Sequence, residues 1–199
     1  MINKIPNGIK IMLFSNSIFW LATNLLIPFL SIFYATELSD VTVTEIGISA
    51  LIFYLSFGSL EPIFGALSDR IKGLRDEALF LITSFMARGI LFILFAFATN
   101  SWHLYIFQFL LGSFRALSGP SSKVLYARFM RHSQSAFFWG IDESFVNISA
   151  ALGAGFGGYL ISIVGFRDML IIAGMLTIIA GIINLLILQN IKKTDISGT

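Results

Sequence analysis

The stretch Gly65-Ala66-Leu67-Ser68-Asp69-Arg70-Ile71-Lys72-Gly73-Leu74-Arg75-Asp76 decides the fold, because it places a strongly charged turn between two long apolar segments. One apolar run begins near Ile46 and ends at this turn, and another begins near Ala78, directly after it. A cluster of Arg, Lys and Asp side chains cannot lie in hydrocarbon. The turn is therefore expected in water at one face of a bilayer, between two membrane-spanning helices.

The composition also indicates a membrane protein. Of the 199 residues, 56% are hydrophobic and 12% are charged, whereas an ordinary soluble domain has about 25% charged residues. The formal net charge of +2 is too small to indicate nucleic-acid binding. The chain has no cysteine, and its two histidines, His103 and His132, lie far apart in the sequence. We therefore expect neither a disulfide framework nor a metal or other cofactor.

Six apolar segments are each long enough, or nearly so, to cross about 30 Å of hydrocarbon, which takes about 20 helical residues. The first is too long for the core of a signal peptide and is interpreted as a retained span that Pro28 can kink. The sequence thus predicts an all-α membrane protein, with a single transmembrane domain over residues 1–199. The predicted spans are residues 11–34, 46–67, 78–98, 102–123, 136–164 and 169–188.

The distribution of basic residues predicts the orientation, because cytoplasmic loops of membrane proteins are rich in Lys and Arg. With the amino terminus inside, the external loops hold only Arg167. This bias predicts an integral protein of the cytoplasmic (inner) membrane with both termini in the cytoplasm. The basic residues on the cytoplasmic side would then be Lys4, Lys10, Arg70, Lys72, Arg75, Lys123, Arg128, Arg131, Lys192 and Lys193.

A weak internal repeat relates the two halves of the chain. At an offset of 92 residues, the turn Gly73-Leu74-Arg75-Asp76 after the second span matches Gly165-Phe166-Arg167-Asp168 after the fifth. A three-helix unit contains an odd number of spans, so its second copy enters the membrane from the opposite side. The six spans are therefore expected to form a 3+3 inverted repeat, as found in transporters.

Several motifs resemble those of the major facilitator superfamily. Gly65-Ala66-Leu67-Ser68-Asp69-Arg70 is similar to the signature Gly-x-Leu-x-Asp-Arg between spans two and three, although Gly73 comes one residue late and Lys72 takes its place. Arg115 to Gly119 resembles the Arg-x-x-x-Gly motif of span four. Gly153 to Gly158 resembles the Gly-Pro-x-x-Gly-Gly motif of span five, with Ala154 in place of proline. The resemblance implies a transporter that works by alternating access, and no catalytic constellation indicates an enzyme.

Members of this family have twelve spans in two halves, whereas this chain resembles the amino-terminal half alone. We therefore expect a parallel C2 homodimer, or a pairing with another half transporter, in which spans two and five of one copy face spans five and two of the other. Gly153, Gly157 and Gly158 would allow close approach at that interface. The alternative is that these glycines pack the fifth span within its own bundle.

The resemblance also implies a gating role for the charged loop. In the dimer, Asp69 would lie at the amino terminus of the partner's fifth span, where free N–H groups and the helix dipole favour an anion. This contact would form when the cavity faces outward and break when it faces inward, with Asp142 as a candidate partner for the basic residues. Alternatively, the loop only anchors the protein at an anionic membrane surface. The residues assigned to this gate are Gly65, Asp69, Arg70, Lys72, Gly73, Arg75 and Asp142.

The charged residues Glu61, Arg88 and Arg115 lie inside predicted spans, where each would cost about 2.5–3.5 kcal/mol if left unpaired at mid-membrane. Counting residues along the helices places Glu61 and Arg115 at a similar depth in the membrane. The long side chain of Arg88 would also let its guanidinium reach Glu61. A carboxylate that loses its cationic partner in apolar surroundings favours the protonated form. Glu61 is therefore a candidate for proton coupling, and the alternative is a permanent structural ion pair.

A few further polar residues could line a substrate cavity. Those in the first span could instead hold that helix to its neighbours. A lining with few polar groups and many Phe residues suits the export of small lipophilic or amphipathic compounds coupled to protons. The alternatives are transport of a small organic anion or sugar, a non-transporting assembly or regulatory protein, and a fragment of a larger carrier. The candidate cavity residues are Asn16, Trp20, Thr23, Gln108, Arg115 and Asn147.

Overall fold

The computed structural model describes residues 5–39, 41–71, 73–130 and 134–197, the last six of these without their side chains. Lys4, Lys72 and Arg131 lie outside the described residues, as do the side chains of Lys192 and Lys193. The described chain is almost entirely helical. Its elements are α1 (Asn7–Asn24), the short 3-10 helix η2 (Ile27–Phe29), α2 (Leu30–Glu37), α3 (Val43–Arg70), α4 (Leu74–Phe95), α5 (Ser101–Phe129), α6 (Ser135–Val164) and α7 (Phe166–Ser197).

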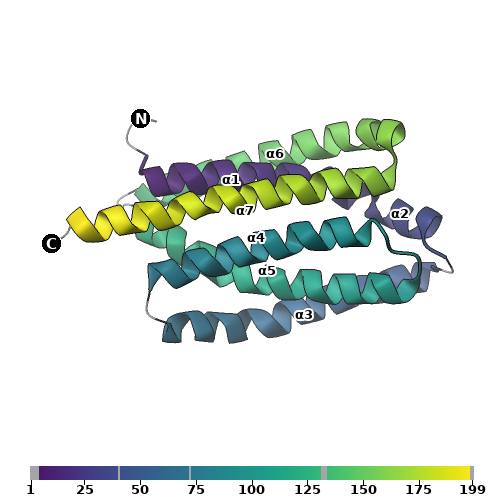
Figure 1. Ribbon diagram of the computed structural model, residues 1–199, viewed down its shortest axis with the longest axis horizontal. Helices are drawn as coiled ribbons and strands as arrows, with labels where there is room; N and C mark the ends of the chain where they lie inside the picture. The colour runs from purple at the N-terminus through teal and green to yellow at the C-terminus, as the bar shows by residue number, and fades with distance from the viewer. Residues whose placement is uncertain (1–4, 40, 72, 131–133, 198–199) are drawn as a thin grey trace.

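The long helices run in alternating directions along one bundle (Figure 1). As a result, α1 begins, α3 ends, α4 begins and α7 ends at the same end of the molecule. The charged turn between α3 and α4 therefore lies at the end where the chain enters and leaves the bundle. We label the two ends of the bundle cytoplasmic and external according to the orientation that the distribution of Lys and Arg predicts, with this end as the cytoplasmic one.

The contacts between helices repeat in the two halves of the chain, which confirms the predicted 3+3 arrangement. The principal packed pairs are α1 with α6, α3 with α5, α4 with α7, α4 with α5, and α1 with α7. If α1, α3 and α4 are exchanged with α5, α6 and α7 respectively, this set of pairs maps onto itself. Since each half contains three antiparallel helices, the two halves enter the bundle in opposite directions, as in an inverted repeat.

Glycines bring the central pair of helices, α4 and α7, into close contact. A Cβ atom at Gly89 would lie 2.7 Å from the carbonyl oxygen of Gly174, and one at Gly174 would lie 2.7 Å from the carbonyl oxygen of Gly89. Neither position can hold a larger residue without moving a backbone, because real Cβ atoms do not approach this closely. The two backbones therefore pack directly on each other, as small residues allow in membrane helices.

The first predicted span is broken, whereas a single kinked helix was expected. α1 ends at Asn24, and η2 and α2 carry the chain on to Glu37. Pro28 lies within η2 and has no N–H to donate, so it cannot continue the hydrogen-bond ladder of an α-helix. The break turns the outer part of this segment away from the axis of α1, as seen for α2 in Figure 1.

Composition alone identifies five membrane-crossing segments in the described chain. These are α1 to α2 taken together, α3, α4, α6 and α7. The remaining long helix, α5, contains Gln108, Arg115 and Lys123, which lower its hydropathy. It nevertheless packs against both α3 and α4 and runs from one end of the bundle to the other (Figure 1). We therefore treat α5 as the sixth membrane helix, and its polar residues identify the side of the bundle described below.

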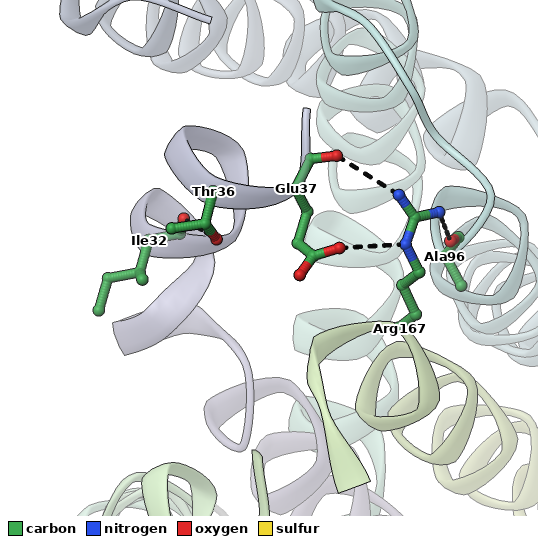
Figure 2. Close-up of polar contacts among 5 residues, drawn as sticks. All are labelled: Ile32, Thr36, Glu37, Ala96 and Arg167. Atoms are coloured by element: carbon green, nitrogen blue, oxygen red, sulfur yellow. Dashed lines mark hydrogen bonds and ion pairs between the residues drawn. The ribbon is translucent and has the colours of Figure 1, made fainter. Parts of the chain in front are cut away.

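The external end of the bundle is held by Arg167 at the start of α7 (Figure 2). Its guanidinium donates hydrogen bonds to the Glu37 carboxylate (3.2 Å), the Glu37 carbonyl (3.4 Å) and the Ala96 carbonyl (2.9 Å). Glu37 ends α2, and Ala96 caps the carboxyl end of α4, so both carbonyls belong to helix ends that lack intrahelical donors. One side chain thus joins α2, α4 and α7.

Candidate functional site

A pocket of about 330 Å³ lies on the side of the bundle formed by α1, α3, α4, α5 and α6. Its walls combine aromatic rings with charged groups, and α7 contributes no residue to it. The lining residues are Asn16, Phe19, Trp20, Phe57, Glu61, Leu81, Phe85, Arg88, Arg115, Ser118, Gly119, Ser122, Lys123, Tyr126, Trp139, Asp142, Glu143 and Val146. Glu61, Arg88 and Arg115, the charged residues that the sequence analysis singled out within spans, are all among them.

Two arginines of this pocket lie against aromatic rings. The Arg88 Cζ atom lies 4.3 Å from the centre of the Phe19 ring, and the Arg115 Cζ atom lies 4.8 Å from that of Phe57. Arg88 is only 5% exposed, and its Nε atom has no hydrogen-bond partner among the described residues. Cation–π contact offsets part of the cost of burying a guanidinium, but it satisfies none of its N–H donors.

Glu61 pairs with Lys123, not with Arg115 as its depth suggested. The Lys123 Nζ atom lies 3.5 Å from Glu61 Oε1. A Cβ atom at Gly119 would lie 2.7 Å from the same oxygen, so the absence of a side chain at Gly119 makes room for the carboxylate. Arg115 lies one helical turn away from Gly119 and faces Phe57 of α3. Counting residues gave the depth of each group but not the direction in which its side chain points.

A second polar group joins three helices on the cytoplasmic side of the pocket. The Tyr126 hydroxyl donates a hydrogen bond to the Asp142 carboxylate and accepts one from Asn16 Nδ2 at 3.3 Å. Asp142 is buried. Within the chain it therefore interacts with Tyr126 of α5, and none of its described contacts is with the charged loop that was expected to supply its partner.

Only some of the predicted cavity residues line the pocket. Asn16, Trp20 and Arg115 line the pocket. Thr23 is buried and donates to the Phe19 carbonyl of its own helix, so it does not reach the pocket. Gln108 donates to the Tyr34 hydroxyl at 2.9 Å, nearer the external end. Asn147 is exposed and bonds to Glu143.

The charged loop lies apart from the pocket, at the cytoplasmic end of α3 and α4. Asp69, Arg70 and Arg75 are exposed, and Lys72 is outside the described residues. Gly73 caps α4, where a Cβ atom would lie 2.8 Å from the Asp76 carboxylate, and Gly65 contacts Pro120 of α5 loosely, at 3.8 Å from a Cβ. The loop's exposed charges are free to meet a partner at this end.

Beneath that loop lies a buried carboxylate that the sequence analysis did not single out. Glu77 in the first turn of α4 accepts a hydrogen bond from the Ser68 hydroxyl near the end of α3. Its other carboxylate oxygen is buried and has no partner in the described part of the chain. Its position in the sequence could have revealed it, because an acidic side chain in the first turn of a helix is stabilised by the positive end of the helix dipole.

The glycines of α6 face the same chain and not a free surface. A Cβ atom at Gly153 would lie 2.5 Å from the Leu21 carbonyl oxygen, and one at Gly157 would lie 2.6 Å from that of Leu25. Gly158 contacts the ring of Phe29. These contacts correspond to the alternative of packing within the bundle and differ from the expected role at a dimer interface. The physical reason is that only glycine lets α6 approach the backbone of α1 this closely.

Lys123, Tyr126 and Trp139 also line the pocket, although the sequence analysis assigned them no role in it. The predicted fourth span stopped at residue 123, whereas α5 continues to Phe129. Arg115, Ser118, Ser122 and Tyr126 recur at helical spacing along one face of α5, and this periodicity was the available signal. Among the described residues, no group of three or more His, Asp or Glu side chains could hold a metal ion.

The sequence is similar to a family model and to several known proteins. The family model described as "Major Facilitator Superfamily" matches residues 12–197. The chain is 27% identical over 147 residues to the membrane sensor protein UhpC of Escherichia coli (strain K12), covering 70% of this chain and 31% of UhpC. It is 28% identical over 159 residues to the multidrug resistance protein MdtG of Proteus mirabilis, covering 77% of this chain and 38% of MdtG.

A third relative matches nearly the whole chain. The chain is 25% identical over 190 residues to the quinolone resistance protein NorA of Staphylococcus aureus, covering 96% of this chain and 47% of NorA. In each of these three comparisons, the matched region is less than half of the relative's length.

Proposed function

The chain belongs to the major facilitator superfamily, and on that premise we propose that it forms one half of a secondary transporter working by alternating access. The observation that carries this proposal is the pocket, because charged and aromatic side chains from five helices converge on one side of the bundle. Such a site needs a facing wall to enclose a solute. We propose that a second copy of the chain, inserted in the same orientation, supplies that wall as a C2 homodimer.

The exposure of α3 and α6 supports this pairing. In their most apolar windows, 11% of the residues of α3 and 17% of those of α6 are buried, compared with 50% in α4 and 44% in α7. Both of these exposed helices also contribute residues to the pocket. A partner that covered α3 and α6 would therefore bury the least packed helices and close the pocket in the same step.

We propose that the solute is a small lipophilic or amphipathic compound that is exported. The aromatic side chains of Phe19, Trp20, Phe57, Phe85 and Trp139 give the pocket large apolar walls, which suit such compounds. The names of MdtG and NorA, which describe resistance to drugs and to quinolones, favour export. A non-transporting regulatory role is the second candidate, because UhpC is named a membrane sensor protein.

Proton coupling in this proposal depends on Glu61. Its side chain is 30% exposed and pairs with Lys123, whose side chain is 70% exposed, so water can reach the pair. Movement of α5 past α3 would separate the two side chains, and Glu61 is proposed to exchange the coupling proton in that state. Asp69 is proposed to close the cytoplasmic side by meeting the amino terminus of the partner's α6, where free N–H groups and the helix dipole favour an anion.

Cysteine cross-linking tests the proposed assembly directly, since the natural chain contains no cysteine. In the double variant Asp69→Cys/Ser135→Cys, oxidation in native membranes should produce a covalent dimer of the chain. In proteoliposomes, the cross-link should stop movement of fluorescent amphipathic dyes, and a reductant should restore the rate that the same double variant shows before oxidation. A matched control is the variant Leu94→Cys, which places a cysteine on the exposed side of α4 and should give no functional block.

The outcome that would overturn the proposal is equally direct. If mass measurement from native lipid showed a single copy with no companion, and the proteoliposomes moved no dye, the transport function would be rejected. A covalent dimer that formed without any dye movement would favour the regulatory role.

A further inference from the structure

The pocket contains two guanidinium groups that have no anionic partner among the described residues. Neither the Arg88 nor the Arg115 guanidinium makes a hydrogen bond or ion pair with another residue of the described chain. Arg88 is 95% removed from solvent, and its guanidinium lies on the ring of Phe19. An unpaired charge at such a site is strongly unfavourable, so a compensating anion is expected there.

Each carboxylate that lines the same pocket already has an ion-pair or hydrogen-bond partner. Glu61 pairs with Lys123, Asp142 accepts the hydroxyl hydrogen bond of Tyr126, and Glu143 accepts a hydrogen bond from Asn147. Moreover, Arg88 and Arg115 lie near enough for each to feel the charge of the other. Two like charges in one pocket repel, and an anion bound between them would relieve this repulsion.

We propose that Arg88 and Arg115 form a subsite for the negatively charged group of an amphipathic solute. The inference rests on the proposed transport function and specifies its substrate class as an organic anion with an apolar body. Each guanidinium lies over a phenyl ring, a contact that uses none of its N–H donors. A carboxylate is planar and can accept two parallel hydrogen bonds from such donors.

Aromatic side chains lie directly beside the two guanidinium groups and could contact the apolar body of the solute. Phe19 and Phe57 lie beneath the two guanidinium groups, and Phe85 stacks on Phe19 with ring centres 4.4 Å apart. The pocket volume of about 330 Å³ is at the lower end of the range for small-molecule sites. A single aromatic ring with a short acidic chain is therefore the appropriate size of probe.

The test measures binding of 4-phenylbutyrate to the full chain in nanodiscs of phosphatidylcholine. Trp20 and Trp139 line the pocket, so their fluorescence reports on it once Trp102, which does not, is replaced by Phe. Saturable binding of 4-phenylbutyrate is expected, with the neutral 4-phenylbutanol and the cationic 4-phenylbutylamine weaker by about tenfold or more, because a charge-assisted hydrogen bond is lost. The variants Arg88→Gln and Arg115→Gln should each weaken the anion by a similar factor.

The control variant is Arg128→Gln, which removes one positive charge from the same helix as Arg115 but at an exposed position outside the pocket. It should bind 4-phenylbutyrate with unchanged affinity. Since Arg88 is buried, the variant Arg88→Gln is also checked by thermal unfolding without probe. If its charge is unpaired as proposed, the neutral variant should be no less stable than the natural protein.

A phospholipid could supply the same chemistry, because its phosphate is an anion on an apolar body. Adding phosphatidylglycerol to the nanodiscs distinguishes this source. Competition that depends on Arg88 and Arg115 would identify lipid as an occupant and would still support the anion subsite. Equal affinity for all three probes, or anion binding that is unchanged in both arginine variants, would overturn the inference. In either case dye movement by the cross-linkable dimer tests the transport function separately.

Discussion

Arg167 shows how a single residue can organise one end of a membrane bundle. Its ion pair with Glu37 is partly exposed, and such pairs contribute little alone. Its hydrogen bonds to the carbonyls of Glu37 and Ala96 matter more, because those groups end α2 and α4 and have no other donor within their helices.

We predict that the substitution Arg167→Gln lowers the free energy of unfolding by about 1–2 kcal/mol, since it removes charge-assisted hydrogen bonds to two helix ends. Glu37→Gln should cost less than about 1 kcal/mol, because the backbone carbonyl of residue 37 remains available to Arg167. Thermal or denaturant unfolding of the purified protein measures both. Equal effects of the two substitutions would mean that the ion pair, and not the capping of helix ends, is what Arg167 contributes.

Glu61 carries the second prediction at the scale of single residues. If it takes up the coupling proton, Glu61→Gln should abolish accumulation of solute driven by a pH gradient while solute exchange without a gradient continues. The two assays are run in the same proteoliposomes. Asp168→Asn, which neutralises an exposed carboxylate at the external end, is the matched control and should leave both intact. Accumulation that survived in Glu61→Gln would assign Glu61 and Lys123 to a purely structural ion pair.

One face of helix α6 packs against the bundle and the other is exposed, and each face carries a glycine that can be substituted to test this difference. Gly153 packs on the backbone of α1, whereas a Cβ atom at Gly155 would meet no other atom within 4 Å. We predict that Gly153→Ala destabilises the fold by about 1–3 kcal/mol through overpacking. Gly155→Ala should instead stabilise it by about 0.5–1 kcal/mol, because alanine loses less backbone freedom in a helix.

Unfolding of the two variants in parallel provides the measurement. They differ by two positions on one helix and make the same chemical change, so each is the control for the other. If both destabilised the protein equally, the close approach of α6 to α1 would not be the reason for glycine at position 153.

At the scale of the whole molecule, the exposed face of α6 is a candidate surface for pairing of two copies. It presents large apolar side chains at helical spacing, namely Phe145, Ile148, Leu152, Phe156, Tyr159 and Ile163. We predict that Gly155→Trp, on the same side of α6, weakens dimer formation by about tenfold or more, as overpacking at an interface would. Mass measurement from native lipid over a range of protein-to-lipid ratios tests this prediction.

The control for that experiment is Leu94→Trp on α4, where leucine is 61% exposed and away from the proposed interface. This variant should dimerise like the natural protein. A monomer in both the natural chain and the control would contradict the proposed homodimer, and a dimer that tolerated Trp at position 155 would place the interface elsewhere.

The sequence predicted the architecture well because the membrane imposes simple rules. The length of the apolar segments indicated the helices, and the turn from Gly65 to Asp76 indicated the family. The orientation that the basic residues indicate stays a prediction. It was less successful where a helix carries polar residues. The fourth span was ended at residue 123, although α5 continues to Phe129 and brings Tyr126 into the pocket.

The sequence by itself determined that this chain is an all-helical membrane protein of the major facilitator superfamily, with charged residues at Glu61, Arg88 and Arg115 inside its spans. Only the tertiary structure decided how those charges are arranged. Glu61 meets Lys123, Asp142 meets Tyr126, and the two arginines lie beside Phe19 and Phe57 with no ion pair to any described residue. The physical reason is that hydropathy depends on composition along the chain, whereas pairing depends on helix rotation and side-chain direction, which are set by packing between segments far apart in sequence.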